Sequence, residues 1–180
     1  MKSLKYLLTA ILAVIIPLSA AAAGGTQKKK KKKADENTME WYYELEAYAA
    51  PYKGSCDVKV WSYGPDVITA RDQAMKNAVH GAIFRGVPGN SSKRLTALPP
   101  LVEDIMAEQN NKAFFDAFFM NGGPYLRFAT KTMADGNDEI LKYGKKNYKV
   151  GVIVTVQYDA LRKALEQQGI INSLTSGFAK

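Results

Sequence analysis

The chain has 180 residues, with 25 Lys and Arg against 17 Asp and Glu, and a formal net charge of +8. The first 33 residues hold the whole excess, because the remainder carries 17 basic and 17 acidic residues. A neutral body argues against a nucleic-acid-binding domain, and a single Cys with a single His excludes both an intramolecular disulfide and a closed zinc site of Cys and His ligands.

Residues 1–23 predict a secretory signal peptide. A positively charged start is followed by an almost wholly apolar stretch at residues 6–18 and then by small residues. Cleavage after Ala21 or Ala23 fits the usual preference, so we expect a periplasmic or secreted protein. The alternative is a retained anchor, because the apolar stretch has about the minimum length of a transmembrane helix, but Pro17 favours cleavage.

Residues 24–37 predict a disordered tether, since they are small, polar and charged and have nothing to bury. Six consecutive lysines in it are the candidate binding residues for an anionic membrane or cell-wall surface: Lys28, Lys29, Lys30, Lys31, Lys32 and Lys33. The attraction is on the order of 1 kcal/mol per lysine. No aromatic residue is interleaved to stack on bases, so no specific nucleic acid is expected. A solvated spacer is the alternative.

Residues 38–180 predict a single domain, and its first element is a short helix. Four residues recur there at helical spacing: Trp41, Leu45, Tyr48 and Ala49. The aromatic residues of this segment leave a sugar-binding strip as an alternative. Alternation at residues 58–63 then predicts a strand. Cys56, just before it, is expected to be a half-buried thiol, with cross-linking of a dimer as the other possibility.

A long helix follows Gly64 and ends at Gly86, with Pro65 at its first position and Asp66 near its positive end. Its alanine-rich face is expected to pack on the sheet. The solvent face is expected to carry the polar residues Arg71, Asp72, Gln73, Lys76 and His80. Residues 86–100 predict a loop from their Gly, Pro, Asn and Ser content.

A second helical region is predicted from the apolar residues Leu101, Val102, Ile105 and Met106, with an interruption at Asn110 and Asn111. Two phenylalanine pairs within residues 114–119 must then face a core. The region ends at residues 122–124, where two glycines precede a proline.

Two antiparallel strands are predicted next, over residues 125–132 and 148–157, with a turn at residues 135–138. Residues 139–143 extend one arm. Asp159 is expected to cap a last helix that closes at Gly169, and the apolar residues after it are expected to pack back on the sheet: Ile170, Ile171, Leu174 and Phe178. The order β-α-α-β-β-α predicts an α+β fold, a small mostly antiparallel sheet with helices on one face.

The sequence offers little catalytic chemistry. His80 has no partner nearby in the chain to orient it as a general base, and a pair with Cys56 requires the fold to bring the two together. The acidic residues around Gly136 lack the alternation of a calcium loop. We therefore expect no catalytic residues, no metal and no cofactor.

The segment VWSYGPDVITARDQAMKNAV at residues 60–79, a strand that leads into an alanine-rich helix, resembles a family of small bacterial envelope domains. The family includes envelope lipoproteins and the N-terminal domain of the flagellar assembly protein T. The similarity spans residues 58–169, where a valine-rich strand and closing helix fit the same pattern. It implies a non-catalytic module that builds or anchors envelope assemblies. This chain lacks the lipidation cysteine, so acylation does not carry over.

The sequence thus predicts an exported, non-catalytic binding and assembly module of the bacterial cell envelope, attached at most peripherally. An envelope protein is the expected partner, and a homo-oligomer is compatible with the sequence. The alternative function is a secreted hydrolase or ligand-binding enzyme with its site on the aromatic face.

Overall fold

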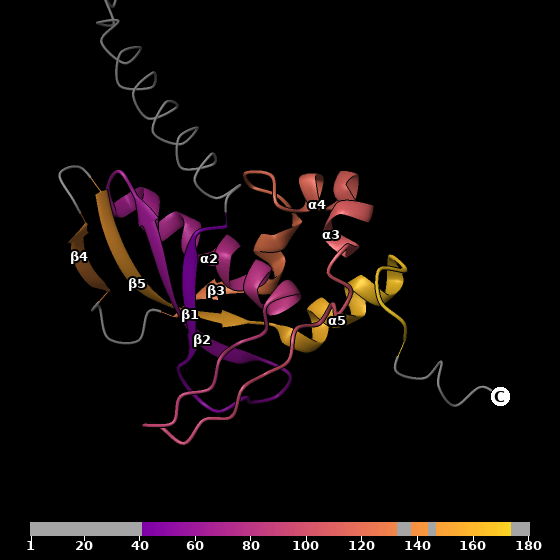
Figure 1. Ribbon diagram of the computed structural model, residues 1–180, viewed down its shortest axis with the longest axis horizontal. Coiled ribbons are helices and arrows are strands. Elements are labelled where there is room, and N and C mark those ends of the chain that lie inside the picture. The colour runs from indigo at the N-terminus through magenta and orange to yellow at the C-terminus, as the bar shows by residue number, and fades with distance from the viewer. Residues whose placement is uncertain (1–40, 133–137, 144–146, 174–180) are drawn as a thin grey trace, which may run out of the picture.

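The computed structural model describes residues 41–132, 138–143 and 147–173. The predicted α+β fold is confirmed (Figure 1). The elements follow in this order: β1 (Tyr43–Ala47), β2 (Cys56–Gly64), α2 (Val67–Phe84), α3 (Ala107–Asn110), α4 (Lys112–Phe118), the 3₁₀ helix η1 (Pro124–Phe128), β3 (Ala129–Lys131), β4 (Glu139–Tyr143), β5 (Asn147–Val156) and α5 (Tyr158–Gln167).

An antiparallel sheet in the order β1, β2, β5 and β3 organises these elements. The predicted pairing of β3 with β5 is confirmed. β4 also pairs with β5, beyond β3 on the same side, because β2 occupies the whole other side. The long β2–β5 pairing, which joins segments far apart in the chain, was not predicted. It places the two valine-rich strands at the centre of the sheet.

One face of the sheet is dry and packs against α2. Its valines are at most 2% exposed: Val58, Val60, Val150, Val152, Val154 and Val156. The facing alanines of α2 are fully buried, as predicted: Ala70, Ala74, Ala78 and Ala82. Their short side chains let the helix backbone lie close to the strands. The helices α3, α4 and α5 gather at the end of the molecule away from β4 (Figure 1).

The predicted first helix is wrong, because residues 43–47 form the edge strand β1. The sequence Tyr-Glu-Leu-Glu-Ala has the alternation of a strand. Its inward residues Tyr43, Leu45 and Ala47 face α2, and Glu44 and Glu46 face outward, in register with β2. The pairing with β2 overrides the helical spacing of the flanking aromatic residues.

Two further boundaries differ from the prediction. Residues 101–106 are not helical: Leu101 and Val102 are buried outside any helix or strand, and Ile105 is 94% exposed. The helical region comprises α3 and α4, with the predicted interruption confirmed at Asn111. Residues 124–128 form a 3₁₀ helix rather than a strand, because Pro124 lies at its first turn and favours helical backbone angles.

The helix ends follow local chemistry. Asp66 is the N-cap of α2 and accepts a hydrogen bond from the Thr69 amide, so Pro65 precedes the cap instead of occupying the first helical position. The N-cap of α5 is Gln157, and Asp159 lies in the first turn rather than at the cap. Gly169 has a φ of +68°, which closes α5 as predicted.

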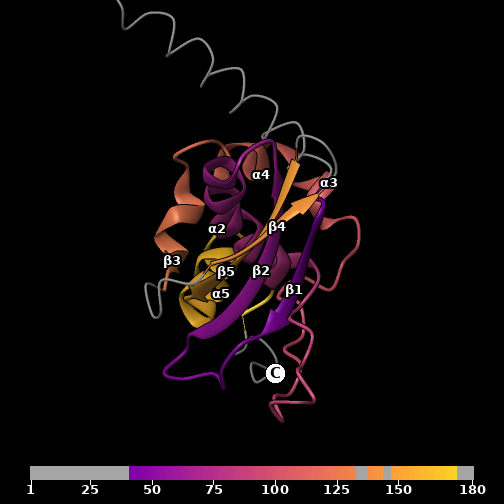
Figure 2. The ribbon, with the colours of Figure 1, turned by 90° about the vertical axis from the view of Figure 1, so that its left-hand side faces the viewer.

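The loop at residues 86–100 is confirmed and projects from the body of the molecule (Figures 1 and 2). Isolated bridges join Val87 to Leu98 and Asn90 to Leu95 along its arms. The predicted turn at residues 135–138, apart from Asp138, lies outside the described residues, as do the signal peptide, the tether, Leu174 and Phe178.

Candidate functional site

His80 is buried in the second half of α2, which corrects its predicted position on the solvent face. Its exposed fraction is 3%, and those of Lys76 and Gln73, predicted on the same face, are 5% and 6%. Arg71 and Asp72 remain accessible, as expected. The second half of the helix is buried because β1 and the segment around α3 and α4 cover it on the sides that the sheet leaves free.

Aromatic rings from three parts of the chain enclose the imidazole of His80. The Trp41 ring stacks on it with the centroids 3.5 Å apart and the planes inclined by 18°. The rings of Phe84 and Phe119 lie 4.9 and 5.7 Å away. The Tyr43 hydroxyl lies 2.6 Å from Nδ1 of His80, within hydrogen-bond distance. Together these groups hold the ring in one orientation.

The local electrostatics favour a neutral histidine. Burial lowers the pKa of His80, although Glu108 opposes this effect. Burial also raises the pKa of the Tyr43 hydroxyl well above its ordinary value, so the phenol keeps its proton. A proton on Nδ1 would leave the lone pair of Nε2 facing the Glu108 carboxylate. We therefore assign the proton to Nε2, and the Tyr43 hydroxyl donates to Nδ1.

Glu108 connects this cluster to the surface. Its Oε1 accepts a hydrogen bond of 3.1 Å from the Trp41 indole and lies 3.4 Å from Nε2 of His80. The contact with His80 is too long and poorly aligned for a good hydrogen bond, and Nε2 has no hydrogen-bond partner among the described residues. Interaction with His80, and more weakly with Trp41, lowers the pKa of the Glu108 carboxyl, so this group is ionised.

Trp41 is held from several sides. Besides its contacts with His80 and Glu108, its carbonyl accepts a 2.8 Å hydrogen bond from Nη2 of Arg85. The same guanidinium lies 4.3 Å from the centroid of the Tyr43 ring. The φ of Trp41 is +47°, a left-handed conformation that is costly for a bulky residue. These contacts offset that cost, and they fix the indole at the wall of a cleft.

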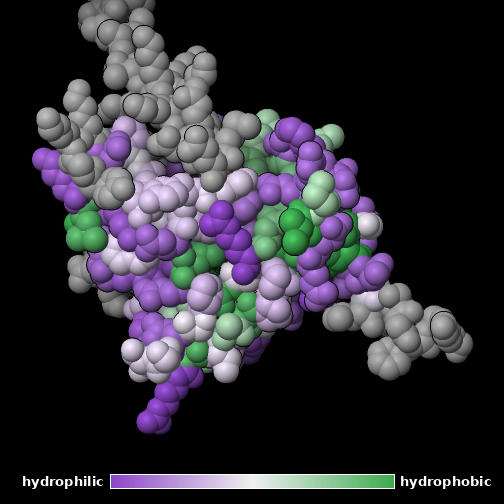
Figure 3. Space-filling model, viewed as in Figure 1, coloured by the Kyte–Doolittle hydropathy of each residue, from purple (hydrophilic) through white to green (hydrophobic). Residues whose placement is uncertain are grey.

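The cleft lies between α2 and the α3–α4 region and has a volume of about 800 Å³. Trp41, Phe115 and Phe119 provide its apolar surface. Its remaining lining residues include Lys76, Glu108, Lys112, Asp116, Ile105 and Met120. Ile105 is 94% and Met120 58% exposed. Apolar surface is visible over α3 in Figure 3. Such a concave surface, apolar with a few charged groups, is typical of binding sites.

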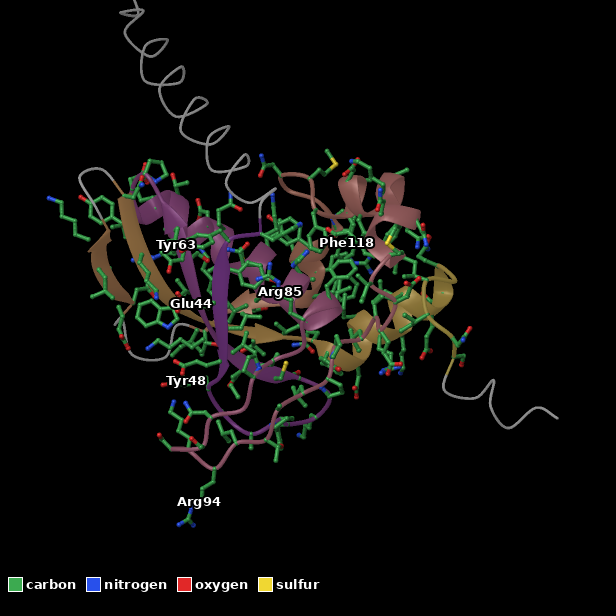
Figure 4. The ribbon with its side chains drawn as sticks, in the orientation of Figure 1. Glu44, Tyr48, Tyr63, Arg85, Arg94 and Phe118 are labelled. Carbon is green, nitrogen blue, oxygen red and sulfur yellow. The ribbon has the colours of Figure 1, made fainter. Side chains whose placement is uncertain are left out.

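The open face of the sheet is a second accessible surface, and its side chains pair with one another. Trp61 lies between Lys59 and Lys149, whose ammonium groups are 4.6 and 5.0 Å from the ring centroid. Lys149 forms an ion pair of 2.8 Å with Glu44, which also accepts a hydrogen bond from Tyr63 (Figure 4). Because these charges are already partnered, this face is a weaker candidate site than the cleft.

The aromatic segment at residues 41–52 does not form one strip. Trp41 and Tyr43 point inward to His80, whereas Tyr42 and Tyr52 are 58% and 68% exposed. The predicted alternative of a continuous sugar-binding strip therefore does not fit the structure.

Cys56 lies at the start of β2, as predicted, and is buried more fully than expected, at 3% exposure. Burial raises the pKa of its thiol to about 12, which makes the thiol unreactive at neutral pH. In the described part of the chain, no hydrogen bond, ion pair or ring contact of His80 involves Cys56. The residues the structure describes contain no cluster of three or more His, Cys, Asp or Glu suited to a metal ion.

The lysine run, Lys28 to Lys33, lies outside the described residues and stays a prediction. Among the helices that the structure describes, none has the length and apolar character needed to cross a membrane. The cleft and the His80 cluster were missed by sequence reasoning. The strand-like alternation at residues 43–47 was the available signal for the position of Tyr43. Nothing in the sequence places Glu108 beside His80.

Comparison of the chain with protein-family models, with curated proteins and with solved structures found no match. The resemblance to the envelope-domain family therefore stays a prediction, and the function is argued from the residues themselves.

Proposed function

We propose that this chain is an exported, non-catalytic binding and assembly module of the bacterial cell envelope. The cleft between α2 and the α3–α4 region holds an apolar segment of an envelope protein partner. The lysine run adds electrostatic contact with an anionic membrane or cell-wall surface. The leader and the neutral body support export and peripheral attachment.

The observation that carries the proposal is the exposure of large apolar side chains around a concave aromatic surface. Ile105 is almost fully accessible and Met120 more than half accessible, beside the rings of Phe115 and Phe119. Single exposed apolar residues are ordinary, but several that line one cleft mark an interaction site. The nearby exposed charges of Lys112 and Asp116 suit the polar edge of a protein interface.

The arrangement around His80 supports a binding role over a catalytic one. Nδ1 is occupied by the Tyr43 hydroxyl and one ring face is covered by Trp41, so a substrate has little access to the imidazole. The groups that reach the cleft, Trp41 and Glu108, are held by the cluster behind them.

Fractionation separates the two contacts. Removal of the charge of residues 28–33 is expected to abolish the salt-sensitive part of envelope association. Replacement of Ile105 and Met120 by serine is expected to abolish the salt-resistant part, whereas Ile68→Ser, a matched change of an exposed residue outside the cleft, leaves it intact. The proposal is contradicted if the variant without the lysine charges and the variant with serine at positions 105 and 120 both stay with the envelope fraction as the wild type does, at low and at high salt. Mass spectrometry of the mature N-terminus tests the export on which it rests.

The second candidate function, a secreted hydrolase or ligand-binding enzyme, is favoured by one observation: an ionised Glu108 lies at the cleft next to a neutral His80. Glu108→Gln keeps the size of the side chain and removes its charge. If the wild-type chain turns over any of a panel of ester, amide or glycoside substrates and this variant does not, the enzymatic function replaces the binding function.

A further inference from the structure

β4 is an edge strand with an open side. It pairs with β5 through residues 139–143, and no other strand in the described part of the chain pairs with it. Figure 1 shows β4 at the extreme end of the sheet, and in Figure 2, viewed from that end, it faces the viewer. A new strand can therefore approach β4 without displacing any of the described elements.

The backbone of β4 on this side has no hydrogen-bond partner among the described residues. In an antiparallel pair alternate residues direct their amide and carbonyl groups to the same neighbour, so half of the polar backbone groups of β4 point away from β5. None of them makes a backbone hydrogen bond to another described segment. A row of such groups is a template for another strand.

The side chains of β4 are unusually apolar for a free edge. Ile140 is 49% and Leu141 52% exposed, and they lie on opposite faces of the strand. Apolar surface is visible at the β4 end of the molecule in Figure 3. The strand has no proline and no bulge in its pairing with β5. Proline and a bulge, two of the devices that keep an edge from associating, are thus absent from this strand, although it is short and carries Glu139 and Lys142.

The other edge of the sheet is less suited to pairing with a second copy. β1 carries outward glutamates at positions 44 and 46, and its Ala47 amide donates to the carbonyl of Pro88, so part of its free side is already occupied. If two copies of β1 paired about Leu45, Glu44 would lie opposite Glu46 of the other copy, and like charges directly opposite are destabilising. The chain is protected against self-pairing at β1.

β4 is compatible with its own copy. Residues directly opposite each other in an antiparallel pair have their side chains on the same face, whereas neighbours along one strand have theirs on opposite faces. The two-fold axis of a symmetric pair must therefore pass at a residue rather than between two residues. Centred on Leu141, the pairing engages the whole strand. It places Glu139 opposite Tyr143 and Ile140 opposite Lys142, with no like charges opposed. Leu141 then meets Leu141 of the second copy and shields half-exposed apolar surface.

We propose that β4 pairs antiparallel with β4 of a second copy of this chain, centred on Leu141, and joins the two sheets into one continuous sheet. One pair of five-residue strands is smaller than the roughly 1,200 Å² of a standard stable interface, so the dimer is weak, with a dissociation constant on the order of 100 µM. The dimer leaves the cleft free, because no residue of β4 lines it.

Disulfide trapping tests the register. Opposed residues in an antiparallel pair have Cα atoms about 4.5 to 5.5 Å apart, within the range that a disulfide spans. Leu141→Cys is therefore expected to form a covalent dimer under mild oxidation. Ile68→Cys, at an apolar position on α2 that is more exposed than Leu141, is the control, and the wild-type chain controls for the buried Cys56. Equal cross-linking of the two variants overturns the proposed register.

Sedimentation equilibrium of the purified chain tests the association itself. Leu141→Lys places two like charges across the two-fold axis and is expected to weaken the dimer at least about tenfold, whereas Ile68→Lys leaves it unchanged. Thermal unfolding checks that both variants fold. A wild-type chain that stays monomeric at concentrations well above 100 µM overturns the proposal, including the case in which β4 instead accepts a strand from a different protein.

Discussion

The two halves of α2, residues 67–75 and 76–84, pack against the rest of the protein in different ways. In the first half, buried alanines on one side alternate with accessible residues such as Ile68 and Asp72 on the other. In the second half, all residues from 76 to 83 are buried, although they include Lys76, Asn77 and His80. A helix that is buried all round is ordinarily apolar all round, so the second half has to satisfy its polar groups inside the protein.

It does so in part, with partners from distant elements, although Oδ1 of Asn77 and Nε2 of His80 have no hydrogen-bond partner among the described residues. Asn77 donates a 2.9 Å hydrogen bond to the hydroxyl of Ser62 on β2, which is itself fully buried. His80 contacts Tyr43 on β1 and Glu108 on α3. The first half depends on close packing of small side chains and the second half on a hydrogen-bonded aromatic cluster. Substitutions in the two halves should therefore differ in size and in their dependence on pH.

The largest effect is expected from His80→Ala. The change removes a ring packed between Trp41 and three other aromatic side chains and leaves the buried Tyr43 hydroxyl without its partner. The cavity and the lost hydrogen bond together should lower the free energy of unfolding by about 3 kcal/mol. Urea unfolding followed by circular dichroism measures it. A loss below that of Tyr43→Phe, which removes the hydroxyl alone, would show that the cluster does not stabilise the fold.

A smaller loss, about 2 kcal/mol, is expected from Ala74→Leu in the first half of the helix. Ala74 is fully buried on the side that faces the sheet, and a larger side chain would push the helix away from the valines. Asp72→Leu, on the accessible side of the same turn, is the control and should change stability by no more than about 0.5 kcal/mol. Equal effects of the two substitutions would contradict close packing of the alanine face.

The difference between the halves also explains how much the sequence could predict. The alanine face and the alternating valines of β5 are local patterns with one clear period, so the helix, the strand and the α+β class were predicted correctly. His80 was assigned to solvent because its neighbours on the helix are polar. Its true surroundings depend on Trp41, Glu108 and Phe119, which lie far away in the chain, and no local pattern reports such contacts.

The same cause explains the errors at β1 and in the candidate site. Residues 41–49 satisfy a helical spacing and, within 43–47, a strand spacing, and only the pairing with β2 decides between them. The cleft depends on where α3 and α4 lie relative to α2, and the sequence left that arrangement open. The exposure of Ile105 could not be predicted for the same reason, because the spacing of Ile105 suggested a buried helical face.

The pH dependence of stability should distinguish the halves further. Burial lowers the pKa of His80 below its ordinary value of 6.5, with Glu108 opposing the shift and Arg85 adding to it. As the pH falls through 6.5, the unfolded chain binds a proton at this residue that the folded chain does not, so stability declines. The slope cannot exceed about 1.4 kcal/mol per pH unit, the value for one proton.

Unfolding free energies measured between pH 7.5 and pH 5 test this effect. His80→Gln should flatten the curve in that interval, whereas Asp72→Asn in the first half of the helix should leave it unchanged. Below about pH 5 the carboxyl groups, including Glu108, begin to contribute, so the comparison is confined to the higher range. An unaltered slope in His80→Gln would mean that the imidazole is not the group that titrates.

The smallest effect is expected on the accessible side of the first half, where Arg71 forms an ion pair with Asp138. The side chains of these two residues are 39% and 26% exposed, so water screens the pair and both groups stay solvated when it is broken. Asp138→Asn should therefore cost no more than about 0.5 kcal/mol, and less at 0.5 M salt. A loss as large as that of His80→Ala would mean that the first half of α2 also depends on a specific polar contact. The contrast between the two halves of the helix would then fail.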